Sequence, residues 1–242
     1  MKTMRTITLM ITILILAGTG LMASCIPIDG LKGDGDVIKE ERKVSGFTSL
    51  EVGGAFTVYL SQGSKETLTI EADKNLMEFI KTRVKGDRLE IYTDGRKINK
   101  FTKMNIYLTF KELEMMDFSG ATKIIGEGMM QFGDLSLNVS GASEITLNME
   151  LGMLTADYSG ASNVELSGKA KSVLFDCSGA SQIDAYEFVA GHGELEASGA
   201  SRVRVNVTDM LDAEVSGAAS VKYKGSPKLT SEVSGAGSLR SY

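Results

Sequence analysis

The chain of 242 residues has no tryptophan, one histidine, two cysteines and two prolines. Two cysteines are too few for a disulfide framework, and one histidine excludes motifs in which two histidines bind a metal. Acidic residues outnumber basic ones by 31 to 26 without a basic stripe, which argues against a nucleic-acid partner. We therefore expect no cofactor, no metal and no catalytic constellation. The scarcity of proline, with 27 glycines, suits a regular array of short strands and tight turns.

Only one long apolar run is present, Ile7–Leu16, and it is shorter than the ~20 residues that span a bilayer. Basic residues precede it, and Leu21–Cys25 places small residues before a cysteine. This pattern is typical of a secretory signal and resembles a bacterial lipobox. We expect residues 1–24 to be removed and Cys25 to carry the lipid that anchors the protein in the cell envelope, at the outer membrane. The alternatives are an ordinary signal peptide with a stray cysteine, or an uncleaved anchor.

Composition then divides the rest of the chain. Residues 25–42 are rich in glycine and aspartate and predict a flexible tether. Residues 43–242 read as a single domain. Its first part, 43–112, has period-2 apolar runs typical of strands, and its second part, 113–242, consists of repeats.

One short helix interrupts the strands of the first part. Asp73 is a suitable N-cap for a helix over Lys74–Lys81. Strands are predicted again at Arg88–Thr93 and Lys103–Phe110.

The tripeptide Ser-Gly-Ala occurs seven times in the second part, with serines at 119, 140, 159, 178, 198, 216 and 234. A period of 18–21 residues indicates a solenoid, in which each repeat buries its apolar face by stacking on its neighbours. Apolar residues alternate on both sides of each tripeptide, so identical positions form inward columns. The sequence therefore predicts an all-β fold, a parallel β-helix. The residue before each serine belongs to one such column: Phe118, Val139, Tyr158, Cys177, Ala197, Val215 and Val233.

Each Ser-Gly-Ala is interpreted as a sharp corner. Glycine accepts positive φ without steric cost, alanine is small enough to sit inside the bend, and stacked serine hydroxyls are able to form a ladder. A ligand role for the serines, in glycan or ice contact, is the alternative. The corner glycines are Gly120, Gly141, Gly160, Gly179, Gly199, Gly217 and Gly235.

An acidic column is predicted two residues before each serine. The alternation places this position outward, with carboxylates ~4.8 Å apart that repel one another. We expect solvent and neighbouring cations such as Lys123 and Arg202 to offset the repulsion. A bound cation or a polycationic partner is the alternative. Asn138 interrupts the column, whose acidic members are Asp117, Asp157, Asp176, Glu196, Glu214 and Glu232.

The order of motifs resembles one known family. The segments Val44–Val52, Ala55–Leu60, Leu68–Leu76 and Leu89–Tyr92, followed by the Ser-Gly-Ala corners, are similar to the head GIN domain family of putative auto-transporter adhesins. The resemblance covers about 43–242. It implies a single β-solenoid domain that is exported and often lipid-anchored in diderm bacteria, and it supplies no catalytic residues.

Three hypotheses of function follow. The first is a non-catalytic module, anchored at Cys25, that binds polysaccharide or another envelope protein. The second is a polysaccharide-active β-helix enzyme, which needs either a carboxylate pair with raised pKa or a basic residue in a cleft. The third is a structural spacer or assembly subunit. In each case, the coil that follows the last corner at 234–236 is predicted to be uncovered, and either shielded by its charges or paired with a partner, for example a second copy.

Overall fold

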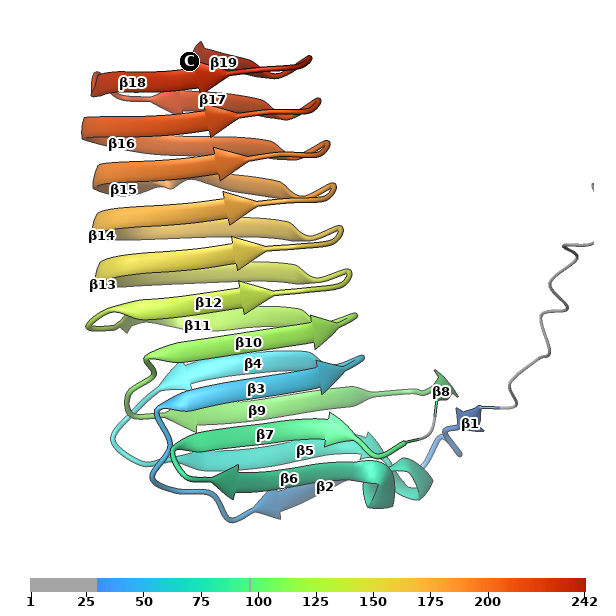
Figure 1. The fold of residues 1–242 in the computed structure, drawn as a ribbon. Coiled ribbons are helices and arrows are strands. Elements are labelled where there is room, and N and C mark those ends of the chain that lie inside the picture. The colour runs from blue at the N-terminus through green and yellow to red at the C-terminus, as the bar shows by residue number, and fades with distance from the viewer. Residues whose placement is uncertain (1–29, 96) are drawn as a thin grey trace, which may run out of the picture. The chain divides into compact units, whose positions relative to one another are not determined.

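Strands make up most of the computed structural model, which describes residues 30–95 and 97–242 (Figure 1). The predicted all-β solenoid is confirmed over the unit Leu31–Tyr242. The predicted lipidation site, Cys25, lies outside the described residues. The strands of the first part are β1 (Leu31–Lys32), β2 (Val37–Arg42), β3 (Ser49–Gly54), β4 (Thr57–Gln62), β5 (Thr67–Asp73), β6 (Ile80–Lys85), β7 (Arg88–Thr93), β8 (Ile98–Lys100) and β9 (Met104–Phe110).

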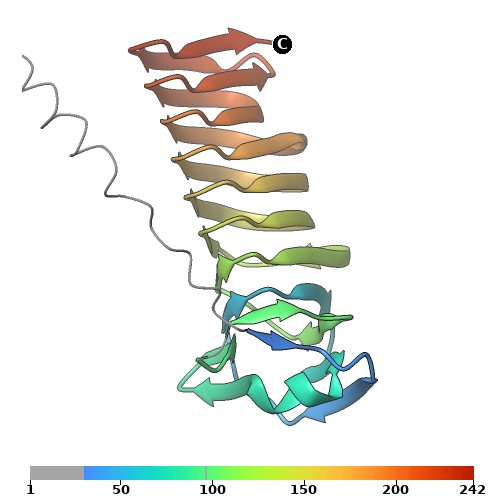
Figure 2. The same cartoon turned by 90° about the vertical axis from the view of Figure 1, so that its right-hand side faces the viewer.

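The repeat region forms coils that each contain one sharp corner and one gentle bend. At the gentle bend the chain stays in strand conformation, so four strands pass from one face of the solenoid to the other. Figure 2 shows the sharp corners stacked along the narrow side. The strands of this part are β10 (Met115–Gly120), β11 (Lys123–Gln131), β12 (Leu135–Val139), β13 (Glu144–Tyr158), β14 (Asn163–Cys177), β15 (Gln182–Ala197), β16 (Arg202–Val215), β17 (Ser220–Lys224), β18 (Lys228–Val233) and β19 (Ser238–Ser241).

Two parallel ladders hold the coils together. On one face, the strands that lead into each corner pair in the order β7, β3, β10, β12, and then the second halves of β13 to β16, ending at β18. On the other face, the strands that leave each corner end at β17 and β19. We call these faces the entry face and the exit face.

Chain order and spatial order differ near the start of the solenoid. The coil made of β3 and β4 lies between the coil of β7 and β9 and the coil of β10 and β11. The segment Gly53–Ala55 therefore forms a further corner, and Gly54 is paired with Gly120. The sequence did not reveal this corner, because glycine replaces serine at its first position.

The first part of the domain covers one end of the solenoid. Antiparallel pairs close this end, β2 on β5 and β6 on β7 (Figure 1). The prediction of a flexible tether over 25–42 is wrong for its last residues. Val37–Arg42 form strand β2, which covers the edge of β5.

The helix prediction also needs correction. A 3-10 helix, η1, covers only Lys74–Phe79, and Asp73 makes no capping bond to it. The buried Asp73 carboxylate instead accepts hydrogen bonds from the backbone N–H groups of Gly35, at 2.8 Å, and Thr102, at 2.7 Å. Desolvation acts to raise the pKa of Asp73, but these hydrogen bonds outweigh it, and the pKa is below its ordinary value.

The core consists of the predicted inward columns. The residue before each corner serine is at most 1 % exposed in every coil but the last, where Val233 is 46 % exposed. Cys177 belongs to this column and is a free, buried thiol, as expected. Burial raises its pKa to about 12, so it packs as a small neutral hydrophobe.

The corners differ in one respect from their interpretation. The seven glycines have φ values between 66° and 97°, the region that only glycine adopts readily. The alanine, expected inside the bend, is exposed, because the chain reverses at the glycine and inward alternation restarts one residue later. That fourth position is buried up to the next-to-last coil: Thr122, Ser143, Ser162, Ser181, Ser201 and Ala219.

The serine ladder was likewise expected at the wrong position. A side-chain link between successive corners occurs at the fourth position, where the hydroxyls of Thr122 and Ser143 are 3.0 Å apart. The first-position hydroxyls of Ser159 and Ser178 instead approach carbonyl oxygens of the preceding coil at 3.5 Å.

Candidate functional site: a groove along the corners

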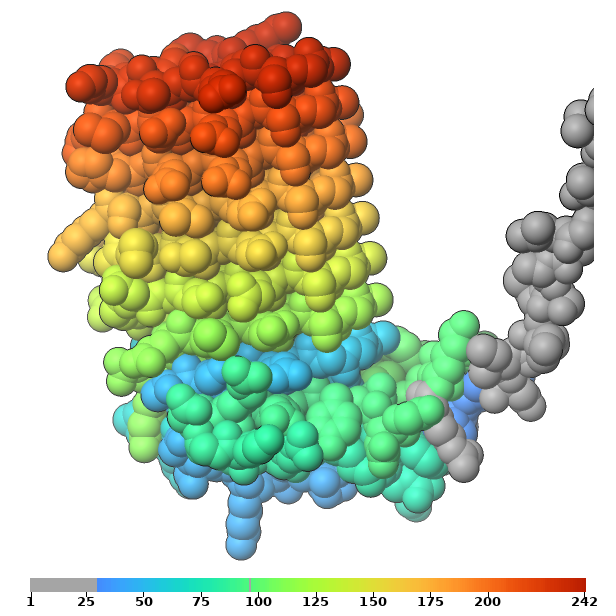
Figure 3. Space-filling view, in the orientation of Figure 1, coloured from blue at the N-terminus to red at the C-terminus, as the bar shows by residue number. Residues whose placement is uncertain are grey.

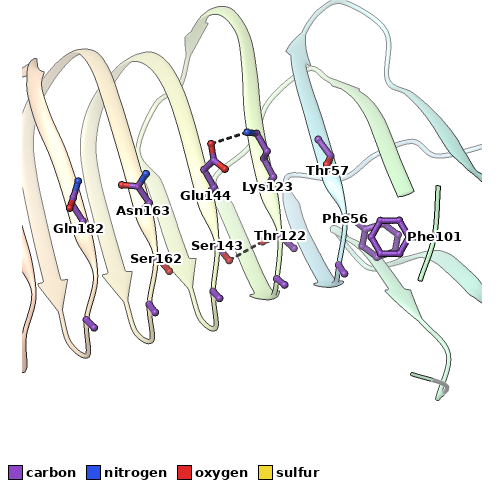
Figure 4. A pocket seen from close by; sticks show the side chains of 15 residues that line it. Phe56, Thr57, Phe101, Thr122, Lys123, Ser143, Glu144, Ser162, Asn163 and Gln182 are labelled. Carbon is purple, nitrogen blue, oxygen red and sulfur yellow. Dashed lines mark hydrogen bonds and ion pairs between the residues drawn. The ribbon is translucent and has the colours of Figure 1, made fainter. Parts of the chain in front are cut away.

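A shallow groove of about 730 Å³ runs along the exit side of the stacked corners (Figure 4). Its floor is a ledge of corner alanines, of which Ala55 is half-buried and the other four are exposed. Because alanine has only a methyl side chain, the ledge stays open to solvent over several coils. The alanines are Ala55, Ala121, Ala142, Ala161 and Ala180.

One wall of the groove is a row of polar side chains on the exit face, at the first outward position after each corner. Lys123 and Glu144 form an ion pair of 2.8 Å in this row. The side-chain amides of Asn163 and Gln182 make no hydrogen bond within the described part of the chain. They therefore offer donors and acceptors toward the groove (Figure 4). Residues one coil apart in the row are in register: Thr57, Lys123, Glu144, Asn163 and Gln182.

Two aromatic rings stand at one end of the groove. Phe56 is buried and Phe101 is 39 % exposed (Figure 4). Phe101 comes from the loop between β8 and β9, so it reaches the groove from the end of the solenoid that the first part of the domain covers. With an exposed aromatic ring at one end and side-chain amides toward the other, the groove offers both an apolar contact and directional hydrogen bonds (Figure 4).

The acidic column lies on the entry face, away from this groove. The register places Asp117, Asn138, Asp157, Asp176, Glu196, Glu214 and Glu232 in consecutive coils. It also adds Glu51 and Glu90, which the sequence analysis did not include. Side chains of successive strands stack in rows on this face (Figure 3).

Among the described residues, cations form ion pairs only with the covered end of the column. Glu51 pairs with Arg88 at 3.0 Å, and Glu90 pairs with Arg83. Lys123 and Arg202, expected to offset the column, lie instead on the exit face. Partial burial, and then the neighbouring charge of Asp176, raises the pKa of Asp157 above its ordinary value. Within the described ranges, no group of three or more His, Cys, Asp or Glu residues has the geometry to hold a metal.

The exit face carries the opposite charge in its last coils. Arg204, Lys222 and Arg240 are in register on consecutive strands, with Arg202 and Lys224 beside them. Arg204 pairs with Asp184 at 2.9 Å and Lys224 approaches Glu187 at 3.9 Å. The last coils are thus acidic on one face and basic on the other.

The groove has little of what glycoside hydrolysis requires. Among the described residues that line it, Glu144 is the one carboxylate, and Lys123 holds it in an ion pair. Glycosidases use two carboxyl groups that flank the scissile bond. What the groove does offer is an apolar floor, side-chain amides and an aromatic ring.

Comparison with known proteins bears on the class of protein. The family model described as "Putative auto-transporter adhesin, head GIN domain" matches residues 46–227. The chain belongs to this family. The match contains every residue of the groove from Ala55 to Gln182. No curated protein matches the chain.

Solved structures share the head GIN fold. A putative adhesin from Bacteroides fragilis is 26% identical, with a TM-score of 0.84, and the alignment covers 88% of this chain and 100% of that one. A putative adhesin from Parabacteroides distasonis is 24% identical, with a TM-score of 0.71 and coverages of 88% and 100%. A protein from the same organism, described as a putative lipid binding protein, is 22% identical, with a TM-score of 0.71 and coverages of 88% and 99%.

Sequence reasoning did not find the groove in this head GIN domain. Its signals were present, as an alanine at the third position of each corner and a polar residue two positions later. The exposure of the alanine was the missing fact. Phe101 gave no signal, because only the fold brings the loop before β9 to the corner of β3 and β4. No helix within the described residues has the length and apolarity to cross a bilayer.

Proposed function

We propose that this head GIN protein is a lipid-anchored binding module of the cell envelope, and that it holds a polysaccharide along the corner groove. The observation that carries the proposal is the row of exposed alanines between an exposed aromatic ring and two unpaired amides. Family membership among adhesins supports a binding role rather than a catalytic one.

The chemistry of the groove suits a sugar polymer. Sugar hydroxyls both donate and accept hydrogen bonds, as do the amides of Asn163 and Gln182. The apolar face of a sugar ring suits the exposed ring of Phe101. The groove repeats similar groups once per coil, ~4.8 Å apart, so it matches a chain of repeated units better than a single small molecule.

Binding of purified protein to a glycan array, followed by titration calorimetry on each positive glycan, tests this function. Residues 30–242 are a suitable sample, since they contain the compact unit and its whole core. Phe101→Ala and the double change Asn163→Ala, Gln182→Ala are expected to weaken binding at least about tenfold each, as loss of buried polar and aromatic contacts does at other sites.

Glu196→Gln, on the entry face, is the matched control and is expected to leave glycan binding unchanged. If the control weakens binding as much as Phe101→Ala does, the acidic column and not the groove holds the glycan. An array without any positive glycan contradicts the proposed ligand.

The anchor is tested separately. Cys25 is expected to be the first residue of the mature protein and to carry more than one acyl chain, since one chain gives only marginal membrane binding. Palmitate labelling in cells is expected for the natural chain and not for Cys25→Ala, which should be released or mis-processed. Absence of label on the natural chain contradicts the anchor.

A further inference from the structure

The coil formed by β18 and β19 leaves core positions uncovered. Leu229 and Val233 are in register with Leu211 and Val215 of the coil before. The earlier pair is 1 % exposed, whereas Leu229 is 39 % and Val233 46 % exposed. Their columns are buried wherever another coil follows, so their exposure comes from the absence of a neighbour on this side.

The same coil also has free strand edges. Among the described residues, β18 pairs only with β16, and β19 only with β17. Edges of this kind present unpaired N–H and C=O groups that accept another strand. The opposite end of the solenoid also finishes in edge strands, β2 and β6, but apolar residues there, such as Leu76 and Ile80, are buried. A head-to-tail stack of molecules would therefore join an open end to a covered one.

A two-fold axis across the open end joins two open ends instead, and forms a closed pair. Two orientations of such a pair make the strands at the junction antiparallel. In the first, β18 lies beside β18 of the other copy, and the acidic entry faces become continuous. In the second, β18 lies beside β19 of the other copy, and each acidic face continues into a basic one.

Charge decides between these orientations. The entry face ends in Glu214 and Glu232, whereas the exit face ends in Lys222 and Arg240. None of these four has an ion pair within the described part of the chain. The second orientation places Glu232 near Arg240 of the partner subunit, and by symmetry this contact occurs twice. The first orientation places like charges together, which is unfavourable.

We propose that a second copy of this chain docks on the coil of β18 and β19 through a two-fold axis, with β18 of each copy beside β19 of the other. Each copy then covers Leu229, Val233 and Leu239 of its partner. The sheets on both faces become continuous through the pair, with antiparallel strands at the junction. This inference concerns the end of the solenoid and is independent of ligand binding in the groove.

Sedimentation equilibrium of residues 30–242 tests the pair. A dimer is expected for the natural sequence, and Leu229→Asp is expected to give a monomer with an unchanged circular dichroism spectrum. Because Leu229 is already exposed in a single copy, this change should not prevent folding. A monomer at every concentration of the natural sequence overturns the proposal.

Charge reversal tests the orientation. Glu232→Lys and Arg240→Glu are each expected to weaken the dimer at least about tenfold, and the two changes together to restore it. Glu196→Lys, the same reversal two coils away, is the control and should leave the dimer intact. If the double variant remains as weak as the single ones, the arrangement of β18 beside β19 is wrong.

Discussion

The corner glycines show how a single atom limits the sequence. At Gly160 the backbone has a φ of 97°, and an added Cβ would clash with the carbonyl oxygen of Gly141 in the coil below. That oxygen is not free to move, because it accepts a hydrogen bond of 2.8 Å from the N–H of Ala161. Strain and clash therefore act together at the seven Ser-Gly-Ala corners, which explains why glycine recurs there.

We predict that Gly160→Ala lowers the free energy of unfolding by more than about 1 kcal/mol. Gly133→Ala is the matched control, because no atom lies within 4 Å of its added Cβ and its φ is not in the left-handed region. Urea unfolding of both variants measures the difference. Equal losses of stability would show that the corner accommodates a side chain.

The buried hydroxyls at the fourth corner position allow two equivalent serines to be compared, one with a hydrogen-bond partner and one without. Ser143 is bonded to Thr122, whereas the hydroxyl of Ser162, one coil further, has no partner in the described structure. We predict that Ser143→Ala costs about 1–3 kcal/mol, since it leaves the Thr122 hydroxyl buried and unpaired. Ser162→Ala should be neutral or stabilising, because it removes an unsatisfied buried group. Unfolding midpoints in urea distinguish the two, and a larger loss for Ser162→Ala contradicts this account.

At the scale of elements, the sequence predicts the strands of the repeated coils, but it does not predict pairings that occur only once. Alternation on both sides of Ser-Gly-Ala is sufficient for the inward columns, because period 2 allows only two registers and one of them buries the polar residues. Strand β7 also has the predicted bounds, Arg88–Thr93. The pairing of β3 with β10 joins residues more than sixty positions apart, and no local pattern encodes it. The place of Phe101 in the groove was missed for the same reason, since Phe101 meets the alanine ledge only in the folded chain.

The covering strand β5 contains the most perturbed carboxylate of the domain. Glu71 is buried and accepts hydrogen bonds from Tyr107, at 2.8 Å, Asn105, at 3.0 Å, and Lys103, at 3.1 Å. The bond from Tyr107 contributes most, and together with the others it outweighs desolvation and lowers the pKa of Glu71 from 4.5 to about 2. The ionised carboxylate thereby links β5 to β9.

This shift predicts a pH dependence. A carboxylate whose pKa is lower in the folded state stabilises the fold above the pKa of the unfolded state, near 4.5, and this contribution is lost as the pH falls toward 2. We expect Glu71→Gln to flatten the fall in thermal unfolding temperature between pH 4.5 and 2. Glu165→Gln, at an exposed carboxylate, should leave the slope unchanged. A slope identical in the natural sequence and Glu71→Gln contradicts the prediction.

At the scale of the whole unit, the solenoid is a stack in which each coil contacts chiefly the next. Stability is then a sum of terms from neighbouring coils, and damage should spread along the axis rather than appear everywhere at once. The first part of the domain is the exception to this linear order. Because β3 and β4 are inserted between later strands, the coil that they form cannot pair on both sides until β7, β9, β10 and β11 are present.

Adjacent residues of one strand test both the register and the linear stack. Val139 is 1 % exposed and is paired with Phe118 and Tyr158 in the neighbouring coils. We predict that Val139→Asp costs several kcal/mol, since it buries an unpaired charge, whereas Asn138→Asp, one residue away and facing outward, costs little. Hydrogen exchange should then rise first in β10, β12 and β13, while β5 and β9 keep their protection. Equal destabilisation by the two changes would place the register off by one residue. A uniform rise in exchange over the whole unit would instead mean that the coils unfold as one cooperative body rather than as a stack.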